Sequence, residues 1–164
     1  MSSTPLKPDI RPIDLEALVA LLEPEMHGAL TALSGQAPLL SGMVDYHLGF
    51  VDSAFEHTEL PASARGKRFR PGTVAMLACA AVGGDPEVAA PLAAAIELLH
   101  NFTLIHDDIQ DQSPTRRHRP TVWSEWGIAQ AINAGDATFR GGTTRALQSP
   151  RSWRRQRFDS PARR

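Results

Sequence analysis

The stretch His100–Asp111, HNFTLIHDDIQD, places an acidic cluster at the end of a long segment that is rich in apolar, helix-forming residues. Asp107 and Asp111 are four residues apart, so on a helix both carboxylates lie on one face. Two like charges at that spacing destabilise a helix end, and a bound cation offsets this cost. Hard oxygen ligands suit Mg²⁺, which takes one or two carboxylates and completes its shell with water and phosphate. The alternative is a solvated acidic helix end without a ligand.

Two basic stretches lie on either side of this cluster in the sequence. Gly66–Pro71, GKRFRP, precedes an expected helix start, where backbone N–H groups, the Lys67 ammonium and the planar fork of Arg70 can hold an anion. Arg116 and Arg117 follow the aspartates. Carboxylates, Mg²⁺ and arginines together suit a diphosphate, because the metal bridges its oxygens to the acids and the arginines take the remaining charge. Each basic stretch alone is equally typical of solvated surface.

Helical periodicity predicts an all-α chain. Asp14 can cap a first helix, and Pro24 is expected to divide it from a second helix that ends near Leu33. Further helices are expected over about 38–55, 71–82, 86 to 108 or 111, and 123–139 with a weak point at residue 127. Gly83-Gly84-Asp85-Pro86 combines a helix stop with a helix start. Residues 112–121 are expected to form a polar loop, since no hairpin signal appears.

The charge distribution indicates an acidic body with a basic end. The net charge is −1, but residues 140–164 hold eight arginines and one acid, which leaves 9 basic and 17 acidic residues before them. That end shows no apolar period, so we expect disorder over 140–164, a loose leader over 1–12 and the helical domain over 13–139. A nucleic-acid-binding arm is the alternative for the tail, although no nucleic-acid fold is predicted elsewhere.

The cellular setting is indicated by three features of the sequence. Cys79 is the only cysteine, which excludes an internal disulfide, and its apolar neighbours predict a buried thiol. The N-terminus lacks a secretory pattern, and no apolar run approaches the roughly 20 residues that span a bilayer. We therefore expect a cytoplasmic protein without a transmembrane segment.

The order of the motifs resembles one enzyme family. GKRFRP at 66–71, HNFTLIHDDIQD at 100–111, RRHRPTVW at 116–123 and WGIAQAINAGD at 126–136 are similar to the motif series of the trans-type polyprenyl diphosphate synthases. The resemblance is close over 65–139 and loose over the N-terminal helices. It implies the N-terminal half of a helical bundle of the isoprenoid synthase type. It also implies Mg²⁺, a homodimer, and condensation of isopentenyl diphosphate with an allylic diphosphate.

The resemblance assigns one set of residues to isopentenyl diphosphate. Lys67, Arg70, His100 and Arg117 match the positions that bind its diphosphate, and Gly66 matches a close backbone approach. His100 lies two helical turns before the acidic cluster and so shares its side of the helix. A lone histidine on an apolar helix is also typical of a core residue, so this alternative stays open.

A second set is implied for the metal and the allylic diphosphate. Asp107 and Asp111 match Mg²⁺ ligands, with Asp108 close by, and Arg116 matches a contact to the allylic diphosphate. With Lys67, these four residues form the expected catalytic set. They stabilise the departing diphosphate by electrostatics and positioning, without a protein nucleophile.

The residues before the acidic cluster bear on product length. Phe102 and Thr103 lie five and four residues before Asp107, where the family sets the length of the product by side-chain bulk. The small Thr103 beside the large Phe102 predicts a product of intermediate length. Phe102 is equally consistent with a core residue.

The sequence departs from the family after residue 139. Family members carry a second aspartate-rich motif, whereas the acids after residue 111 are only Glu125, Asp136 and Asp159. The abrupt change in composition is typical of a truncated or frameshifted reading frame. We therefore expect the chain alone to be a poor or inactive catalyst.

Three other functions compete with this interpretation. His106-Asp107 is also found in HD-type phosphohydrolases, but His118 is too close to supply a further ligand there. A terpene cyclase shares the aspartate motif but has no use for the GKRFRP loop. A non-catalytic diphosphate-binding remnant, or a partner subunit of a full-length synthase, stays open.

Overall fold

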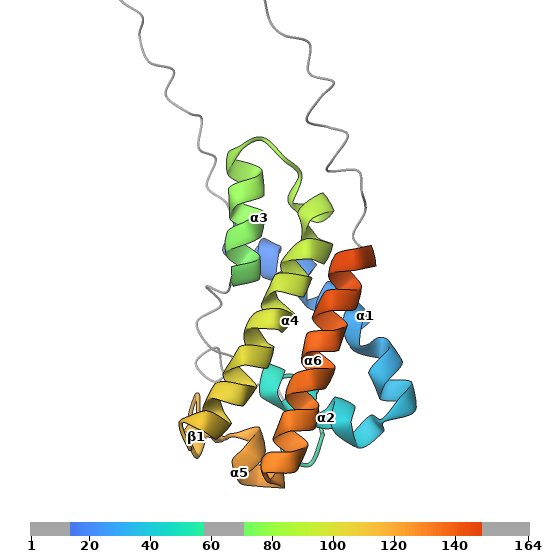
Figure 1. The fold of residues 1–164 in the computed structure, drawn as a ribbon. Coiled ribbons are helices and arrows are strands. Elements are labelled where there is room, and N and C mark those ends of the chain that lie inside the picture. The colour runs from blue at the N-terminus through green and yellow to red at the C-terminus, as the bar shows by residue number, and fades with distance from the viewer. Residues whose placement is uncertain (1–13, 58–70, 149–164) are drawn as a thin grey trace, which may run out of the picture.

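The computed structural model describes residues 14–57 and 71–148, which are almost entirely helical (Figure 1). Six helices and one two-stranded hairpin follow one another in these ranges. They are α1 (Leu15–Gln36), α2 (Pro38–Leu48), α3 (Pro71–Ala81), α4 (Pro86–Gln110), β1 (Thr115–Arg116), β2 (Arg119–Pro120), α5 (Val122–Trp126) and α6 (Ile128–Gln148). The predicted all-α fold class is confirmed.

Helix α1 is continuous, so the division expected at Pro24 is wrong. The Asp14 carboxylate accepts hydrogen bonds from the backbone N–H groups of Glu16 at 2.9 Å and Ala17 at 3.4 Å, as expected of an N-cap. Pro24 removes one backbone hydrogen bond. Burial of apolar side chains continues on both sides of it, at Leu18, Leu22, Met26 and Leu30. Tertiary packing therefore outweighs the local cost of the proline.

Helix α2 ends earlier than its apolar pattern suggested. Gly49 adopts the left-handed conformation, with φ 84° and ψ 24°, and ends the helix, so the expected continuation to Phe55 is wrong. The chain then turns back on itself, and an isolated bridge pairs Val51 with His57. This short turn is where the described residues before position 58 end.

Helices α3 and α4 form a tight helical hairpin. Gly83 has φ 80°, the Asp85 carboxylate accepts a hydrogen bond from Glu87 N–H at 2.9 Å, and Pro86 occupies the first helical turn. The predicted stop and start are therefore confirmed. At the other end of α3, a Cβ added at Gly72 would lie 2.5 Å from the backbone oxygen of Ala93. Glycine thus permits close contact between the two helices.

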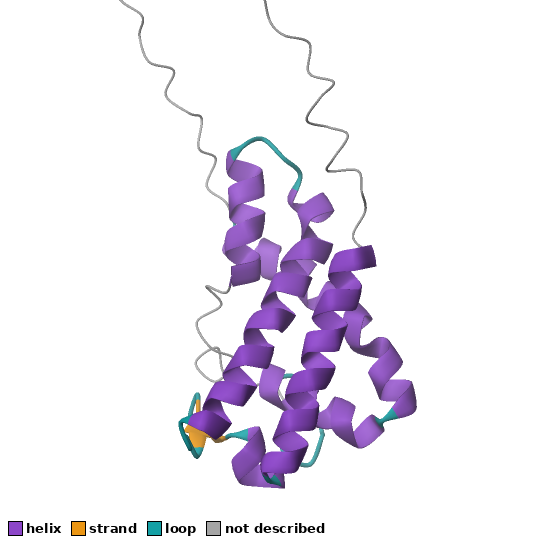
Figure 2. Cartoon of the chain, viewed as in Figure 1, coloured by secondary structure: helices purple, strands orange, loops and turns teal. Residues whose placement is uncertain are grey.

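The expected loop over 112–121 contains a small antiparallel hairpin, coloured as strand in Figure 2. Arg116 pairs with Arg119, and Arg117 and His118 form the turn with φ 54° and 64°. Positive φ at both central residues is the geometry of a type I′ turn. The sequence contains no Asn-Gly pair to signal it, so the prediction of a plain loop is wrong here.

Helices α5 and α6 are separated at Gly127, which has φ 86° and ψ 163° and confirms the expected weak point. Helix α6 packs on α4 and lies beside it in Figure 1. A Cβ added at Gly135 would lie 2.3 Å from Nε2 of His106. The small residue therefore lets α6 approach α4 closely.

Helix α6 continues to Gln148, so the expected change from helix to disorder after Phe139 is wrong for residues 140–148. The reason is packing. A Cβ at Gly141 would lie 2.8 Å from Cδ2 of Leu30, and one at Gly142 would lie 3.1 Å from the backbone oxygen of Ala95. These glycines form a contact surface rather than a helix end. Residues 149–164 and the leader lie outside the described residues.

Helix α4 supplies the centre of the core. It lies between α3 and α6 and also contacts α1 (Figure 1). By length and composition it is apolar enough to cross a membrane, contrary to the expectation from the sequence. It nevertheless packs on three helices and buries the polar side chains of Glu97, Asn101 and Asp108. These features are those of a core helix in a globular domain. Cys79 on α3 is only half-buried, so the buried thiol expected from its apolar neighbours is wrong.

Candidate functional site

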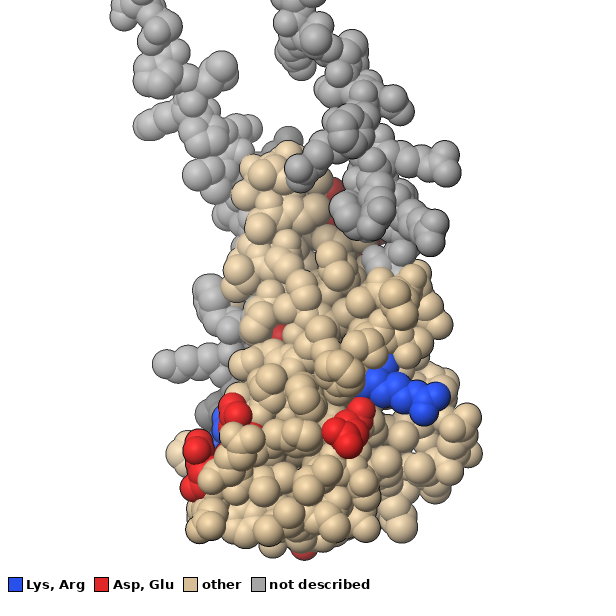
Figure 3. Space-filling view, viewed as in Figure 1, with Lys and Arg blue, Asp and Glu red and all other residues tan. Residues whose placement is uncertain are grey.

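The acidic end of α4 presents two carboxylates to solvent. Asp107 and Asp111 are both exposed. The backbone N–H of Asp111 donates to the oxygen of Asp107 at 2.8 Å, so Asp111 keeps the helical register although it is the C-cap. Figure 3 shows acidic side chains at this end of the molecule, on a face that is otherwise mostly uncharged.

Asp108 points the other way. Its side chain is only 3% exposed, and the guanidinium of Arg116 binds it with Nε at 2.9 and 3.0 Å from the two oxygens and Nη2 at 2.9 Å from Oδ1. This two-pronged geometry is the strongest form of a carboxylate–arginine contact. Asp108 is therefore separated from Asp107 and Asp111, and it fastens β1 to the last turn of α4.

The carboxylates that remain suit Mg²⁺ chemically. Mg²⁺ commonly binds one or two carboxylates and keeps several waters or substrate oxygens. Asp107 and Asp111 offer hard oxygen ligands one helical turn apart, and both are accessible. Among residues 14–57 and 71–148, no group of three or more histidine, cysteine or acidic residues could enclose a metal ion. Two carboxylates on a Mg²⁺ ion would leave the other positions of its shell to water or phosphate oxygens.

The hairpin gathers three arginines beside α4. Arg116, Arg117 and Arg119 line a cavity of about 20 Å³ together with Tyr46 and Asp108. This volume holds a single water molecule. Three guanidinium groups against one carboxylate leave the wall of this cavity cationic, which favours an anion nearby.

Arg119 and Tyr46 were missed by the sequence analysis. Arg119 donates to the backbone oxygens of Tyr46 at 3.2 Å and Val51 at 2.8 Å, and its Cζ lies 3.9 Å from the centre of the Tyr46 ring. The Tyr46 hydroxyl donates to the oxygen of Pro120 at 2.9 Å. Arg119 stands within RRHRP, but no local signal reveals partners 68 and 73 residues away.

The residues expected on the face of α4 behave differently from one another. His100 is half-buried, and Thr103 is exposed with its hydroxyl donating to the backbone oxygen of His100 at 2.7 Å. Phe102 turns toward α6, where its ring centre lies 5.1 Å from that of Phe139 and 4.7 Å from that of His106. Phe102 thus contributes to the contact between α4 and α6, whereas Thr103 is exposed to solvent.

Gly66, Lys67 and Arg70 lie outside the described residues, so their place relative to the acidic cluster stays a prediction. The first turn of α3 follows Arg70 directly in the sequence. Its Gly72 N–H makes a long contact of 3.5 Å with the buried carboxylate of Glu97, which in turn accepts from Asn101 at 2.9 Å. Glu97 was also missed, because one acid within an apolar helix carries no pattern.

The sequence and the fold both have known relatives. A family model described as polyprenyl synthetase matches residues 53–149. A geranylgeranyl diphosphate synthase of Mycobacterium tuberculosis is 46% identical over 123 residues, which are 75% of this chain and 33% of that protein. A short chain isoprenyl diphosphate synthase of Methanothermobacter thermautotrophicus is 54% identical over 77 residues, which are 47% of this chain and 23% of that protein.

A solved structure is similar over most of the chain. A polyprenyl synthetase from Streptomyces coelicolor A3(2) gives a TM-score of 0.65 at 34% identity, covering 82% of this chain and 39% of that one. The chain therefore spans about a third of the length of the relatives it matches. The family match also extends past residue 139, in agreement with the continuous helix α6.

Proposed function

The chain belongs to the polyprenyl synthetase family, and on this premise we propose that it carries the N-terminal part of a prenyltransferase site. The reaction would join isopentenyl diphosphate to an allylic diphosphate and give a longer polyprenyl diphosphate. The printed names of the relatives, geranylgeranyl and farnesyl diphosphate synthases, support this substrate class. Because the chain spans about a third of their length, the proposal concerns the half-site that its own residues build.

One observation carries the proposal: two exposed carboxylates, Asp107 and Asp111, stand one helical turn apart beside a hairpin that carries three arginines. Asp107 and Asp111 would hold Mg²⁺, whose chemistry is to neutralise charge on the departing diphosphate. Asp108 would act indirectly, since Arg116 occupies its carboxylate. We therefore keep Asp107 and Asp111 as proposed metal ligands and give Asp108 the task of orienting Arg116.

The cationic residues would divide the two diphosphates between them. We assign Arg116 to the allylic diphosphate, and Arg117, His100, Lys67 and Arg70 to isopentenyl diphosphate, with Gly66 at a close backbone approach. As the allylic C–O bond breaks, the diphosphate leaves with the electron pair, and fixed positive charges stabilise it without reorganisation. The double bond of isopentenyl diphosphate then forms the new C–C bond, and a proton is lost.

Product length would depend on the residues one turn before Asp107. Thr103 is exposed on the same helix face as Asp107, so its small side chain would leave room for a growing chain. The ring contact of Phe102 with Phe139 favours a core role for Phe102 over a direct limit on product length. A product of intermediate length remains our expectation.

A non-catalytic role as a partner subunit is the second candidate, and an exposed apolar face supports it. Four large apolar residues of α6 are 43–88% exposed: Ile128, Ile132, Phe139 and Leu147. Apolar surface of this kind is typical of an interface with another chain. We also propose that the chain forms a homodimer and lies in the cytoplasm.

Binding and turnover separate these functions. We expect the purified 164-residue chain to bind farnesyl diphosphate, an allylic diphosphate, in the presence of Mg²⁺ in titration calorimetry. We expect little product from isopentenyl and farnesyl diphosphates, because no second DDxxD motif follows residue 111 in this sequence. Asp107→Asn/Asp111→Asn should abolish the Mg²⁺ dependence of binding, with the exposed Glu56→Gln as the control. If the unmodified chain bound the diphosphate equally well with and without Mg²⁺, the proposed metal pair would be refuted.

A further inference from the structure

The guanidinium of Arg119 connects three separate segments of the described chain. Its Nη1 donates to the backbone oxygen of Tyr46 in the last turn of α2, at 3.2 Å. Its Nη2 donates to the oxygen of Val51, in the turn that follows α2, at 2.8 Å. Arg119 itself belongs to β2. One side chain thus ties the hairpin to α2 and to the segment that leads toward residue 58.

Tyr46 on α2 makes two further contacts with the hairpin. Its ring lies under Arg119, with 3.9 Å between Cζ and the ring centre, and its hydroxyl donates to the oxygen of Pro120 at 2.9 Å. The residue is only 4% exposed, and its ring meets Trp126 edge to face at 4.9 Å. Burial raises the pKa of Tyr46, so its hydroxyl stays a hydrogen-bond donor at neutral pH.

The two strands of the hairpin are therefore held at two different places. Arg116 on β1 forms an ion pair with Asp108 of α4. Arg119, which pairs with Arg116 in the strand register, donates a hydrogen bond to the backbone of α2. Arg117 stands in the turn between these two anchors, with φ 54°. Its position relative to the acidic end of α4 depends on both.

We propose that Arg119 is a positioning residue, which holds Arg116 and Arg117 in the arrangement that binds a diphosphate. This inference rests on the proposed function, because the ligand is the one proposed for those two arginines. Arg119 acts through the planar fork of its guanidinium, which reaches two carbonyl groups while stacking on a ring. A lysine has the same charge but neither the fork nor the flat face.

Arg119→Lys is therefore the decisive variant, with Arg140→Lys on the exposed side of α6 as its matched control. Two measurements are made on the full chain. The first is the rate of tryptic cleavage after residues 116 and 117 under native conditions, relative to cleavage after residue 145 in α6. The second is the affinity for inorganic pyrophosphate with Mg²⁺ by calorimetry. Tyr46→Phe provides a second route, because it removes the hydroxyl that donates to Pro120 and keeps the ring beneath Arg119.

We expect Arg119→Lys to speed cleavage in the hairpin at least about tenfold, with cleavage in α6 unchanged, and to weaken pyrophosphate binding about tenfold. Tyr46→Phe should change both in the same direction and by less, and Arg140→Lys should change neither. Unchanged cleavage in the hairpin of Arg119→Lys would overturn the proposal, as would faster cleavage with full affinity. Absence of pyrophosphate binding by the unmodified chain would be a failure of the proposed function, visible before any substitution, and would remove the positioning role with it.

Discussion

At the scale of single residues, the ion pair of Asp108 and Arg116 attaches the hairpin to α4, and substitutions in this pair test the attachment. The carboxylate is 3% exposed and the guanidinium 32%. Arg116→Ala leaves the buried charge without its partner, so we expect it to lower the free energy of unfolding by about 2–4 kcal/mol. Urea denaturation monitored by circular dichroism measures this loss.

The matched control for this pair is a double substitution. Asp108→Asn/Arg116→Ala removes the buried charge together with its partner, so it should recover part of the stability that Arg116→Ala loses. A double variant as unstable as the sum of both single variants would mean that the two side chains do not interact in solution.

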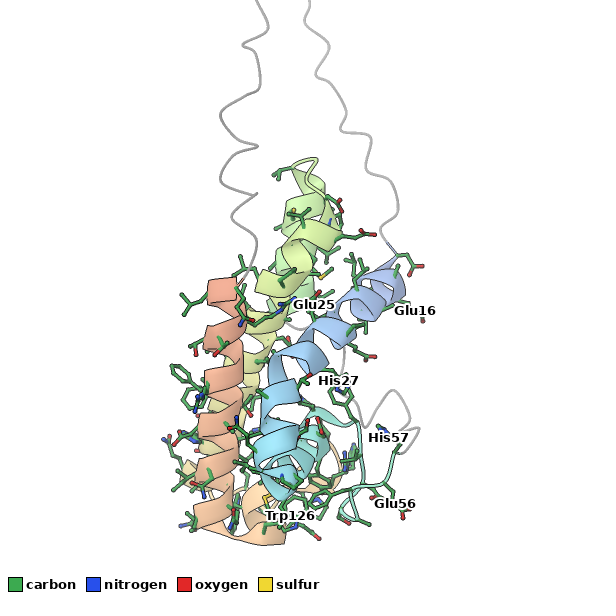
Figure 4. All side chains as sticks on the ribbon, turned by 90° about the vertical axis from the view of Figure 1, so that its right-hand side faces the viewer. Glu16, Glu25, His27, Glu56, His57 and Trp126 are labelled. Carbon is green, nitrogen blue, oxygen red and sulfur yellow. The ribbon has the colours of Figure 1, made fainter. Side chains whose placement is uncertain are left out.

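The surroundings of Asp45, which lies far from the acidic cluster in the sequence, predict that the stability of the fold depends on pH. It is half-buried on α2 and lines a groove of about 410 Å³ with His27 and His57, which lie on the same side of the molecule in Figure 4. Burial raises the pKa of the Asp45 carboxyl, while the two histidines act in the opposite direction. The folded state therefore binds this proton more tightly than the unfolded state. The contribution of Asp45 to the free energy of unfolding therefore falls as the pH rises from the usual aspartate pKa of about 3.9 toward the raised pKa in the folded state.

Asp45→Asn should flatten that part of the stability profile. We expect the wild-type melting temperature to lose more than that of Asp45→Asn as the pH rises above about 4. Differential scanning calorimetry measures both, and the exposed Glu56→Gln on the neighbouring turn is the control. Parallel profiles for Asp45→Asn and wild type would mean that the carboxyl is not perturbed.

Helical spacing was enough to predict the shared face of Asp107 and Asp111, because it depends only on local geometry. The same reasoning could not separate Asp108 from them. Its burial depends on Arg116, eight residues further on, lying back against α4 after an unsignalled turn. Local periodicity identifies a face, but the partner of each side chain is decided by the fold.

At the scale of helices, a substitution at Gly72 tests the close contact between α3 and α4. A Cβ there would lie 2.5 Å from the backbone oxygen of Ala93, an atom that cannot move aside without shifting α4. Gly72→Ala should therefore lower the free energy of unfolding by about 1–3 kcal/mol, although alanine is the better helix former. Gly28→Ala in α1 meets nothing within 4 Å and should stabilise the chain by about 0.5–1 kcal/mol. Chemical denaturation of both variants measures the difference, and equal effects would contradict the close contact.

Helix boundaries were predicted where a cap or a strained glycine sets them, as at Asp14, Asp85 and Gly127. They were missed where residues that usually break a helix lie in a packed one. Pro24 sits within α1, and Gly141 and Gly142 lie against α1 and α4. In each case the contacts of neighbouring side chains outweigh a local preference of a few kcal/mol or less.

At the scale of the whole molecule, the helix order followed from the sequence, but the arrangement of the helices did not. The contact of Arg119 with Tyr46 joins residues 73 apart, and the ion pair of Arg145 with Glu25 joins residues 120 apart. Such pairs leave no periodic trace in either segment. The motifs nevertheless pointed to the right family, because four separate stretches had to occur in one order.

The extent of α6 can be tested by shortening the chain. A chain of residues 1–139 loses the contacts of Gly141 with Leu30 and of Gly142 with α4, together with the pair of Arg145 with Glu25. We expect its free energy of unfolding to fall by more than about 2 kcal/mol, with a melting temperature lower by about 4–8 °C. A chain of residues 1–148 keeps all these contacts.

The composition of residues 149–164 predicts disorder, so the 1–148 chain should melt within about 2 °C of the full chain. Thermal unfolding followed by circular dichroism compares the three lengths directly. If the 1–139 chain matched the full chain, the last turns of α6 would contribute no stability, and the break first expected after residue 139 would be restored. If the 1–148 chain were also less stable than the full chain, residues 149–164 would contribute to the fold and the predicted disorder would be wrong.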